Sequence, residues 1–112
     1  MRKALVLALV AGLLGPAAAP AVAATKKVTV GDNFFVRDGS VPTVTVNKGT
    51  KVRWVWKGKS LHNVKVTKGP AKFGSPSKTS GSFAKKVRKS GRYTIICTVH
   101  GASDQSMKLV VR

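Results

Sequence analysis

The chain has 112 residues, with 21 Lys and Arg against only three acidic residues, and its formal net charge is +18. This length allows one small domain and excludes a multidomain enzyme. One Cys, two His and two Met leave few side chains for catalysis or metal binding. The positive charge is either a solvated face or a surface suited to acidic partners, because net charge governs association rather than fold.

The N-terminal segment predicts export. Met1–Lys3 carries positive charge, Ala4–Leu14 is an apolar run, and small residues follow up to Ala21-Val22-Ala23. This order is typical of a secretory signal peptide, so we predict a cleaved segment over residues 1–23 and a mature domain over residues 24–112. The apolar run is shorter than the ~20 residues that a membrane-spanning helix needs, which disfavours the alternative of a retained membrane anchor.

The mature part predicts an all-β domain. Short extended runs alternate with Gly, Pro, Ser and Asn, and no segment keeps a helical apolar period. Side chains alternate within the runs, so that Val52, Trp54 and Trp56 share one face while Lys51 and Arg53 share the other. The predicted strands are Lys27–Val30, Phe34–Val36, Thr43–Val46, Lys51–Trp56, His62–Val66, Ser82–Val87, Arg92–Cys97 and Met107–Val111.

The connections complete this prediction. Asn47–Gly49 predicts a hairpin turn, Gly58–Ser60 a second connection, and Lys68–Ser82 a long loop. Seven to eight short strands at this spacing indicate a β-sandwich or barrel. Trp54 and Trp56 are predicted to pack in its core, with an electron-relay role as the alternative.

Four side chains of the mature part carry soft or imidazole donors. Cys97 and His100 lie on one short segment, Met107 follows them, and His62 lies at the start of an earlier predicted strand. An exported protein normally pairs its cysteines in disulfides, yet Cys97 has no partner, so a metal is the simplest occupant of its sulfur. One thiolate, two imidazoles and one thioether form a donor set that suits copper.

Each of these residues also has an ordinary structural explanation. His62 fits a half-buried strand histidine, Cys97 a small buried apolar residue, and Met107 a core residue on the same face as Leu109 and Val111. A Cys–His nucleophile lacks a residue to orient it, and a closed zinc site is poorly served by one Cys and a Met. The four residues together favour copper over these alternatives.

The order of these residues resembles the cupredoxins, specifically the single-domain blue copper proteins similar to plastocyanin, amicyanin and pseudoazurin. The most specific similarities are His62-Asn-Val64 and the pattern Gly-x-Tyr-x-x-x-Cys-x-x-His ending at His100, and weaker ones cover Val28–Phe35 and Val44–Trp54. The resemblance implies a Greek-key β-sandwich and one type 1 copper ion. It also implies that Asn63 ties its segment to the Cys97 loop. The implied ligands are His62, Cys97, His100 and, as the long axial donor, Met107.

One departure from the family concerns the axial position. Relatives of this type have two or four residues between the last His and the axial Met, whereas Gly101–Ser106 places six there. Gln105 or a backbone carbonyl is therefore an alternative axial donor. Met107 is favoured because its strand parity matches that of Leu109, which is predicted to face inward.

The resemblance implies a shuttle of single electrons rather than an enzyme. Protein donors fill the coordination positions, so no open site remains for a substrate. By the same resemblance His100 is the surface port for electrons, with Gly101 and Ala102 as a flat rim for docking. We expect a monomer that meets acidic redox partners and associates electrostatically with an anionic cell envelope.

Two other functions use the same features. A copper carrier or buffer would use the same ligands without an electron-shuttle role, with the residues after His100 as a flexible gate. A secreted polycation would bind anionic polymers through segments such as Lys85–Lys89. Specific nucleic-acid binding is not expected, because no exposed aromatic residues are interleaved with the basic ones.

Overall fold

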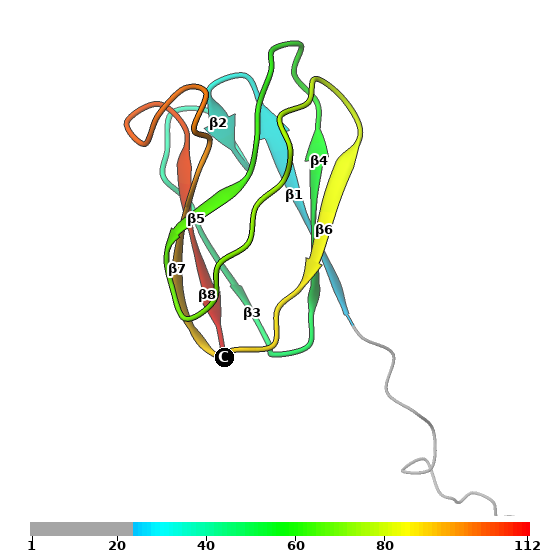
Figure 1. Cartoon of the computed structure of the whole chain (residues 1–112), viewed down its shortest axis with the longest axis vertical. Coiled ribbons are helices and arrows are strands. Elements are labelled where there is room, and N and C mark those ends of the chain that lie inside the picture. The colour runs from blue at the N-terminus through cyan, green and yellow to red at the C-terminus, as the bar shows by residue number, and fades with distance from the viewer. Residues whose placement is uncertain (1–23) are drawn as a thin grey trace, which may run out of the picture.

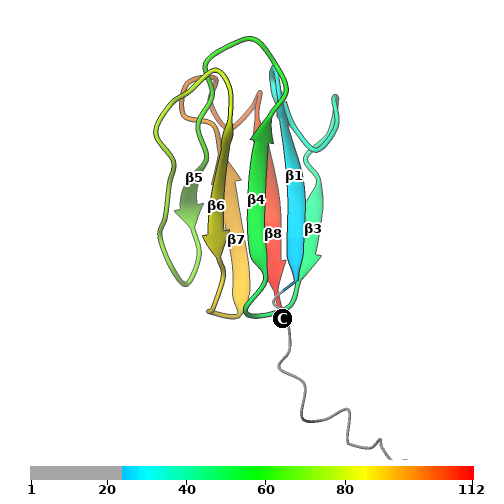
Figure 2. The ribbon, with the colours of Figure 1, turned by 90° about the vertical axis from the view of Figure 1, so that its right-hand side faces the viewer.

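The computed structural model describes residues 24–112; the predicted signal peptide, residues 1–23, lies outside them. Eight strands form two four-stranded sheets, ordered β2-β1-β4-β6 and β3-β8-β7-β5, that pack face to face (Figures 1 and 2). Within this part of the chain no helix is long and apolar enough to cross a membrane. The strands are β1 (Thr25–Gly31), β2 (Phe34–Phe35), β3 (Thr43–Val46), β4 (Lys51–Trp56), β5 (Lys65–Lys68), β6 (Ser82–Lys86), β7 (Gly91–Ile96) and β8 (Ser106–Val111).

The strand order confirms the predicted all-β sandwich. β1 pairs with β4 in parallel, β3 pairs with β8 in parallel, and the remaining pairs are antiparallel. Strands that are neighbours in sequence often belong to different sheets, as in Greek-key folds. The chain therefore crosses repeatedly between the sheets, and segments distant in sequence meet at the two ends of the sandwich.

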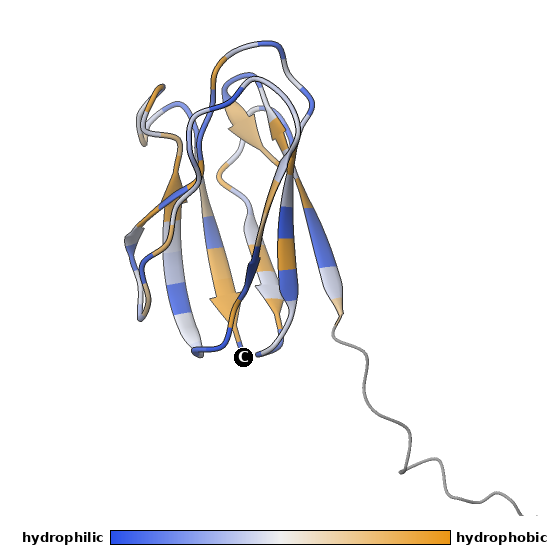
Figure 3. Cartoon of the chain, turned by 45° about the vertical axis from the view of Figure 1, so that its right-hand side comes forward, coloured by the Kyte–Doolittle hydropathy of each residue, from blue (hydrophilic) through white to orange (hydrophobic). Residues whose placement is uncertain are grey.

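The core follows the predicted alternation. In β4 the side chains of Val52, Trp54 and Trp56 are buried between the sheets, whereas Lys51 and Arg53 are exposed. Figure 3 shows this as alternating apolar and polar bands along the strands. Each buried aliphatic or aromatic side chain stabilises the fold by about 1.5–3 kcal/mol relative to an exposed one. The sandwich is therefore a stiff support for the residues at its ends.

The predicted hairpin turn at Asn47–Gly49 is wrong in one respect. A turn is present, since the Thr50 amide donates to the Asn47 carbonyl at 3.1 Å. However, β3 pairs with β8 and β4 pairs with β1 and β6, so this turn connects the two sheets instead of closing a hairpin. The turn residues alone do not specify which strands pair, because each of the two strands can bury its apolar face in either sheet.

The predicted strand His62–Val66 begins later, as β5 at Lys65. His62 forms an isolated bridge with Lys78, in which each backbone amide donates to the other's carbonyl, at 3.0 and 2.9 Å. Part of the predicted loop Lys68–Ser82 thus lies alongside His62 and forms hydrogen bonds with its backbone amide and carbonyl. The ligand segment is extended but is not a regular strand of either sheet.

Candidate metal centre

The segment after β7 forms a closed loop that carries two of the predicted ligands. Cys97 directly follows β7, and its amide donates to the Gln105 carbonyl at 3.0 Å. The Gly101 amide donates to the Cys97 carbonyl at 2.8 Å, and the Gln105 amide donates to the Gly101 carbonyl at 3.0 Å. Gly101 has φ 88°, a left-handed conformation that favours glycine. Backbone hydrogen bonds therefore hold Cys97 and His100 on one compact loop.

His62 reaches this loop from the connection between β4 and β5. Its Nδ1 lies 4.0 Å from the Cys97 sulfur, and the His100 Nδ1 lies 3.5 Å from the same sulfur. The two imidazole rings are 4.8 Å apart between centroids, and one ligand atom from each of the three residues lies within 4.8 Å of the others. His62 and Cys97 are fully buried, and His100 is partly buried.

These three donors fit one metal ion. Metal–nitrogen bonds of about 2.0 Å and metal–sulfur bonds of about 2.3 Å separate the donors around an ion by roughly 3–4 Å. The two sulfur–nitrogen separations, 3.5 and 4.0 Å, are of this size, and all three donor atoms lie within 4.8 Å of one another. A thiolate with two imidazoles, arranged as a triangle, is the set of strong donors in type 1 copper sites. The residues present therefore fit a single copper ion of this type.

Asn63 ties the two ligand segments together, as predicted. Its Nδ2 donates to the Thr98 hydroxyl at 2.8 Å, and its Oδ1 accepts from the Thr98 amide at 2.8 Å. Thr98 is adjacent to Cys97, and Asn63 is adjacent to His62. This pair of hydrogen bonds, the Asn63–Thr98 brace, therefore fixes the spacing of two ligands that lie 35 residues apart in sequence.

Comparisons of structure place this fold in a known group. A mutant of amicyanin in its oxidized state matches with a TM-score of 0.65 and 22% identity over 78% of this chain and 81% of that one. A purple cupredoxin from Nitrosopumilus maritimus matches with a TM-score of 0.64 and 20% identity over 78% of this chain and 99% of that one. The domain has the cupredoxin fold. No protein-family model matches the sequence, and no curated protein matches it.

Gln105 is a buried polar side chain that contacts His62. It is 1% exposed, and its Oε1 lies 2.8 Å from the His62 Nδ1. Its Nε2 donates to two backbone carbonyls, those of Gly31 at 2.9 Å and Phe34 at 2.8 Å. Because these two bonds occupy the nitrogen, the amide oxygen is the atom directed at the donors.

Met107 lies further along β8. It is fully buried and pairs with Ile95 of β7, and it shares its inward face with Leu109 and Val111, as its parity predicted. Of the four predicted ligands, the structure brings His62, Cys97 and His100 together. The axial role of Met107 stays a prediction.

Asp32 contacts His62 and was not predicted from the sequence. Its Oδ1 lies 2.8 Å from the His62 Nε2, and its carboxylate also accepts from the Lys59 and Ser60 amides. The hydrogen bonds from His62, Ser60 and Lys59 favour the charged carboxylate and hold the pKa of Asp32 well below its usual range. The only available signal was that Asp32 is one of three acids in a basic chain, which does not reveal its partner.

The two tryptophans pack as predicted. Trp54 is fully buried and lies 5.9 and 5.8 Å, between ring centroids, from Phe73 and Phe83. Trp56 is nearly buried, and its Nε1 donates to the His62 carbonyl at 3.2 Å. Trp56 therefore supports the backbone of the His62 segment from the core side.

Asn63→Ala is expected to loosen the metal centre, because it removes both hydrogen bonds of the Asn63–Thr98 brace. Two hydrogen bonds between protein groups contribute about 1–3 kcal/mol together. We expect the free energy of unfolding of the metal-free domain to fall by about this amount, measured by denaturant titration. The control is Asn47→Ala, in the turn at the far end of the sandwich. Equal losses for the two variants would contradict a bracing role.

Proposed function

We propose that this protein is an exported type 1 copper protein that carries single electrons between redox partners. The observation that carries the proposal is the convergence of His62, Cys97 and His100 on one point of a rigid β-sandwich. When bound, copper supplies a one-electron couple between Cu(I) and Cu(II). The protein's contribution is to hold the donors in one arrangement that serves both states.

The donor set favours copper over zinc. Structural zinc sites use four strong donors, usually with two or more cysteines, whereas this chain brings one thiolate and two imidazoles together. Thiolate stabilises Cu(I), and imidazole tolerates both oxidation states of copper. The single buried Cys97 is thus accounted for without a disulfide.

The surroundings of the donors favour electron transfer over catalysis. The closed ligand loop and the Asn63–Thr98 brace limit movement of the donors, which keeps reorganisation small when the charge of the ion changes. Three surface grooves of the described domain are lined by residues other than the three ligands. We therefore propose a carrier without enzymatic activity.

His100 is the proposed port for electrons. It is the most exposed of the three ligands, and its neighbour Val99 and the neighbour of His62, Leu61, are each 45% exposed. We propose that these two apolar side chains contact the partner protein. With Gly101 and Ala102 they provide an uncharged contact area around the partly buried imidazole.

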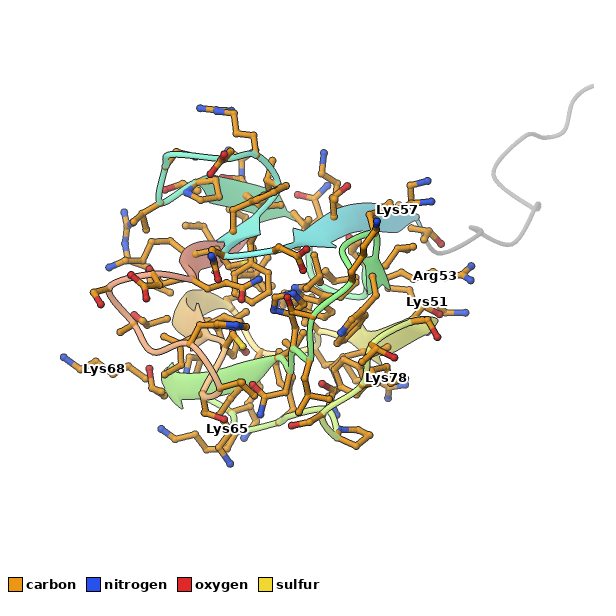
Figure 4. The ribbon with its side chains drawn as sticks, turned by 90° about the horizontal axis from the view of Figure 1, so that it is seen from above. Lys51, Arg53, Lys57, Lys65, Lys68 and Lys78 are labelled. Carbon is orange, nitrogen blue, oxygen red and sulfur yellow. The ribbon has the colours of Figure 1, made fainter. Side chains whose placement is uncertain are left out.

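Basic residues lie around this end of the domain. Figure 4 looks down on it and shows the labelled side chains of Lys65 and Lys68 reaching outward on one side, whereas the partly buried Lys78 has its Nζ 5.3 Å from the centroid of the Trp56 ring. Lys57, Lys65 and Lys68 are exposed. Such an arrangement attracts an acidic redox protein and orients it before contact. We propose acidic partners, with a monomer as the working form.

Export belongs to the same proposal. It depends on the sequence of residues 1–23, and the net charge of +18 additionally suits loose electrostatic association with an anionic envelope. The alternative function, an extracytoplasmic copper carrier or buffer, uses the same donors. It requires ready release of the ion, which the closed loop disfavours.

Copper reconstitution tests the proposed function. The purified domain, residues 24–112, is expected to bind one Cu(II) and to develop the intense visible absorption of a copper–thiolate bond, because Cys97 is the only sulfur among the three converging donors. Cys97→Ser is expected to lose this absorption, whereas Ser103→Ala on the same loop is expected to keep it. Optical and spin-resonance spectra make the measurement.

An absence of the thiolate band in the wild-type domain would contradict a type 1 site. Electron self-exchange then separates the two functions of such a site. Fast exchange with slow loss of Cu(I) to a chelator supports the shuttle. Slow exchange with ready loss of Cu(I) supports the carrier and contradicts the shuttle.

The fourth, axial donor is proposed to be Gln105 in preference to Met107. Its oxygen is directed at the donors by the two hydrogen bonds of its nitrogen, and four residues separate it from His100, a spacing found in the family. An amide oxygen is a harder donor than a thioether and favours Cu(II).

Gln105→Met is therefore expected to raise the midpoint potential by about 59 mV or more, the value for a tenfold change in relative affinity. The matched variant Met107→Leu is expected to keep the potential and the spectra, and to lower the free energy of unfolding by less than about 1.5 kcal/mol. The reverse pattern, with spectra that respond to Met107→Leu and not to Gln105→Met, would establish Met107 as the axial donor.

Charge reversal tests the proposed docking face. Lys57→Glu with Lys59→Glu is expected to slow electron transfer to an acidic cytochrome on the order of tenfold at low salt, because steering acts mainly on the association rate. The control is Lys48→Glu with Lys89→Glu, which changes the net charge equally at the other end. Stopped-flow rates across a salt series make the measurement. Equal effects of the two pairs would contradict a localised docking face.

A further inference from the structure

Asp32 lies beside the metal centre, in the turn that follows β1. Its carboxylate is 43% exposed, whereas its partner His62 is fully buried, and their Oδ1 and Nε2 atoms are 2.8 Å apart. The other two acids of the chain, Asp38 and Asp104, line a separate groove. Asp32 is therefore the acid whose carboxylate touches a proposed ligand.

The carboxylate is held in place by the chain that leads to His62. The Lys59 amide lies 3.1 Å from each of its oxygens, and the Ser60 amide lies 3.0 Å from Oδ1. Gly58 permits this approach, because a Cβ at that position would overlap the Asp32 side chain and backbone. The position of the carboxylate is thus fixed by three donors from the residues 59–62, not by one flexible contact.

This contact gives the two ring nitrogens of His62 different partners. A carboxylate accepts hydrogen bonds and does not donate them, so Nε2 carries a proton and donates it to Asp32. Nδ1 lies on the other side of the ring, 4.0 Å from the Cys97 sulfur and 2.8 Å from the Gln105 Oε1, so a metal ion bound to Nδ1 would take the place of its contact with Gln105. A carboxylate behind a histidine ligand orients the ring and makes its metal-binding nitrogen more basic.

The two histidines therefore differ. His62 is buried and anchored by a carboxylate, while His100 is partly exposed, and in the described part of the chain its one hydrogen-bond contact is with the Cys97 sulfur. Negative charge close to the ring of one ligand stabilises the ion with the higher charge. Solvent around the half-exposed Asp32 weakens this effect without removing it, because Nε2 itself is buried.

We propose that Asp32 is a positioning residue of the metal centre, which fixes His62 through Nε2 and favours Cu(II) over Cu(I). The inference rests on the proposed copper site, and the Asp32–His62 contact can be tested separately from copper binding. On this proposal the carboxylate of Asp32, which is not itself a ligand, controls part of the redox potential.

Three variants test the proposal by separating charge from hydrogen bonding. Asp32→Asn keeps an oxygen that accepts from Nε2 and removes the charge, Asp32→Ala removes both, and Asp38→Asn removes one charge away from the site. Loss of such outer groups typically reduces metal affinity by 10–100-fold. We expect Asp32→Asn to lower the affinity for Cu(II) relative to Cu(I) about tenfold, which raises the midpoint potential by about 59 mV. Asp38→Asn is expected to leave the midpoint potential nearly unchanged.

The second measurement needs no copper. Nuclear magnetic resonance of the metal-free domain is expected to show a solvent-protected Nε2 proton on His62 in the wild type and in Asp32→Asn, and its loss in Asp32→Ala. Equal potentials for Asp32→Asn and the wild type, or an Nε2 proton that is unaffected in Asp32→Ala, would overturn the proposal. Failure of the proposed function is distinct from this, because it would appear as the absence of a copper–thiolate band in the wild type.

Discussion

Three donor atoms from two distant segments bind one ion tightly only if the fold, and not the ion, brings them together. Here the Cys97 sulfur lies 3.5 Å from one imidazole nitrogen and 4.0 Å from another. Hydrogen bonds of the backbone and of Asn63 hold the ligand segments at this spacing. The same stiffness keeps the arrangement similar in two oxidation states, which is what an electron carrier needs.

Each ligand is held by a different part of the structure. Backbone hydrogen bonds close the loop that carries Cys97 and His100, and the Asn63–Thr98 brace connects that loop to the His62 segment. Asp32 and Gln105 occupy the two ring nitrogens of His62, and Trp56 supports its carbonyl. His62 is accordingly the most constrained of the three ligands, whereas His100 faces the surface where a partner would dock.

The distribution of charge complements this arrangement. The chain carries a net charge of +18, yet one of its three acids lies within hydrogen-bond distance of a buried ligand. The labelled side chains of Lys65 and Lys68 in Figure 4 point outward, away from the centre. We therefore propose that the positive charge acts on the approach of partners, while the one nearby negative charge acts on the ion itself.

Sequence patterns predicted the parts of this molecule that depend on local periodicity or on residue type. The inward face of β4 follows from the alternation of Val52, Trp54 and Trp56, and the convergence of His62, Cys97 and His100 follows from the scarcity of soft donors and from family resemblance. The Asn63 contact was likewise expected by resemblance.

Features that depend on strand partners were not predictable in this way. The connection after β3 crosses between sheets, and His62 pairs with Lys78 outside any strand, because turn and alternation signals do not specify which segments pair. Asp32 and Gln105 meet His62 across 30 and 43 residues of sequence. No local pattern marks such contacts, since they arise only when the two sheets are assembled.

X-ray absorption spectroscopy of the copper-loaded domain tests the central claim most directly, because it counts the atoms bonded to the ion. We predict one short copper–sulfur bond and two copper–nitrogen bonds from imidazole, with the sulfur contribution lost in Cys97→Ser. A first shell made only of nitrogen and oxygen in the wild type would contradict it.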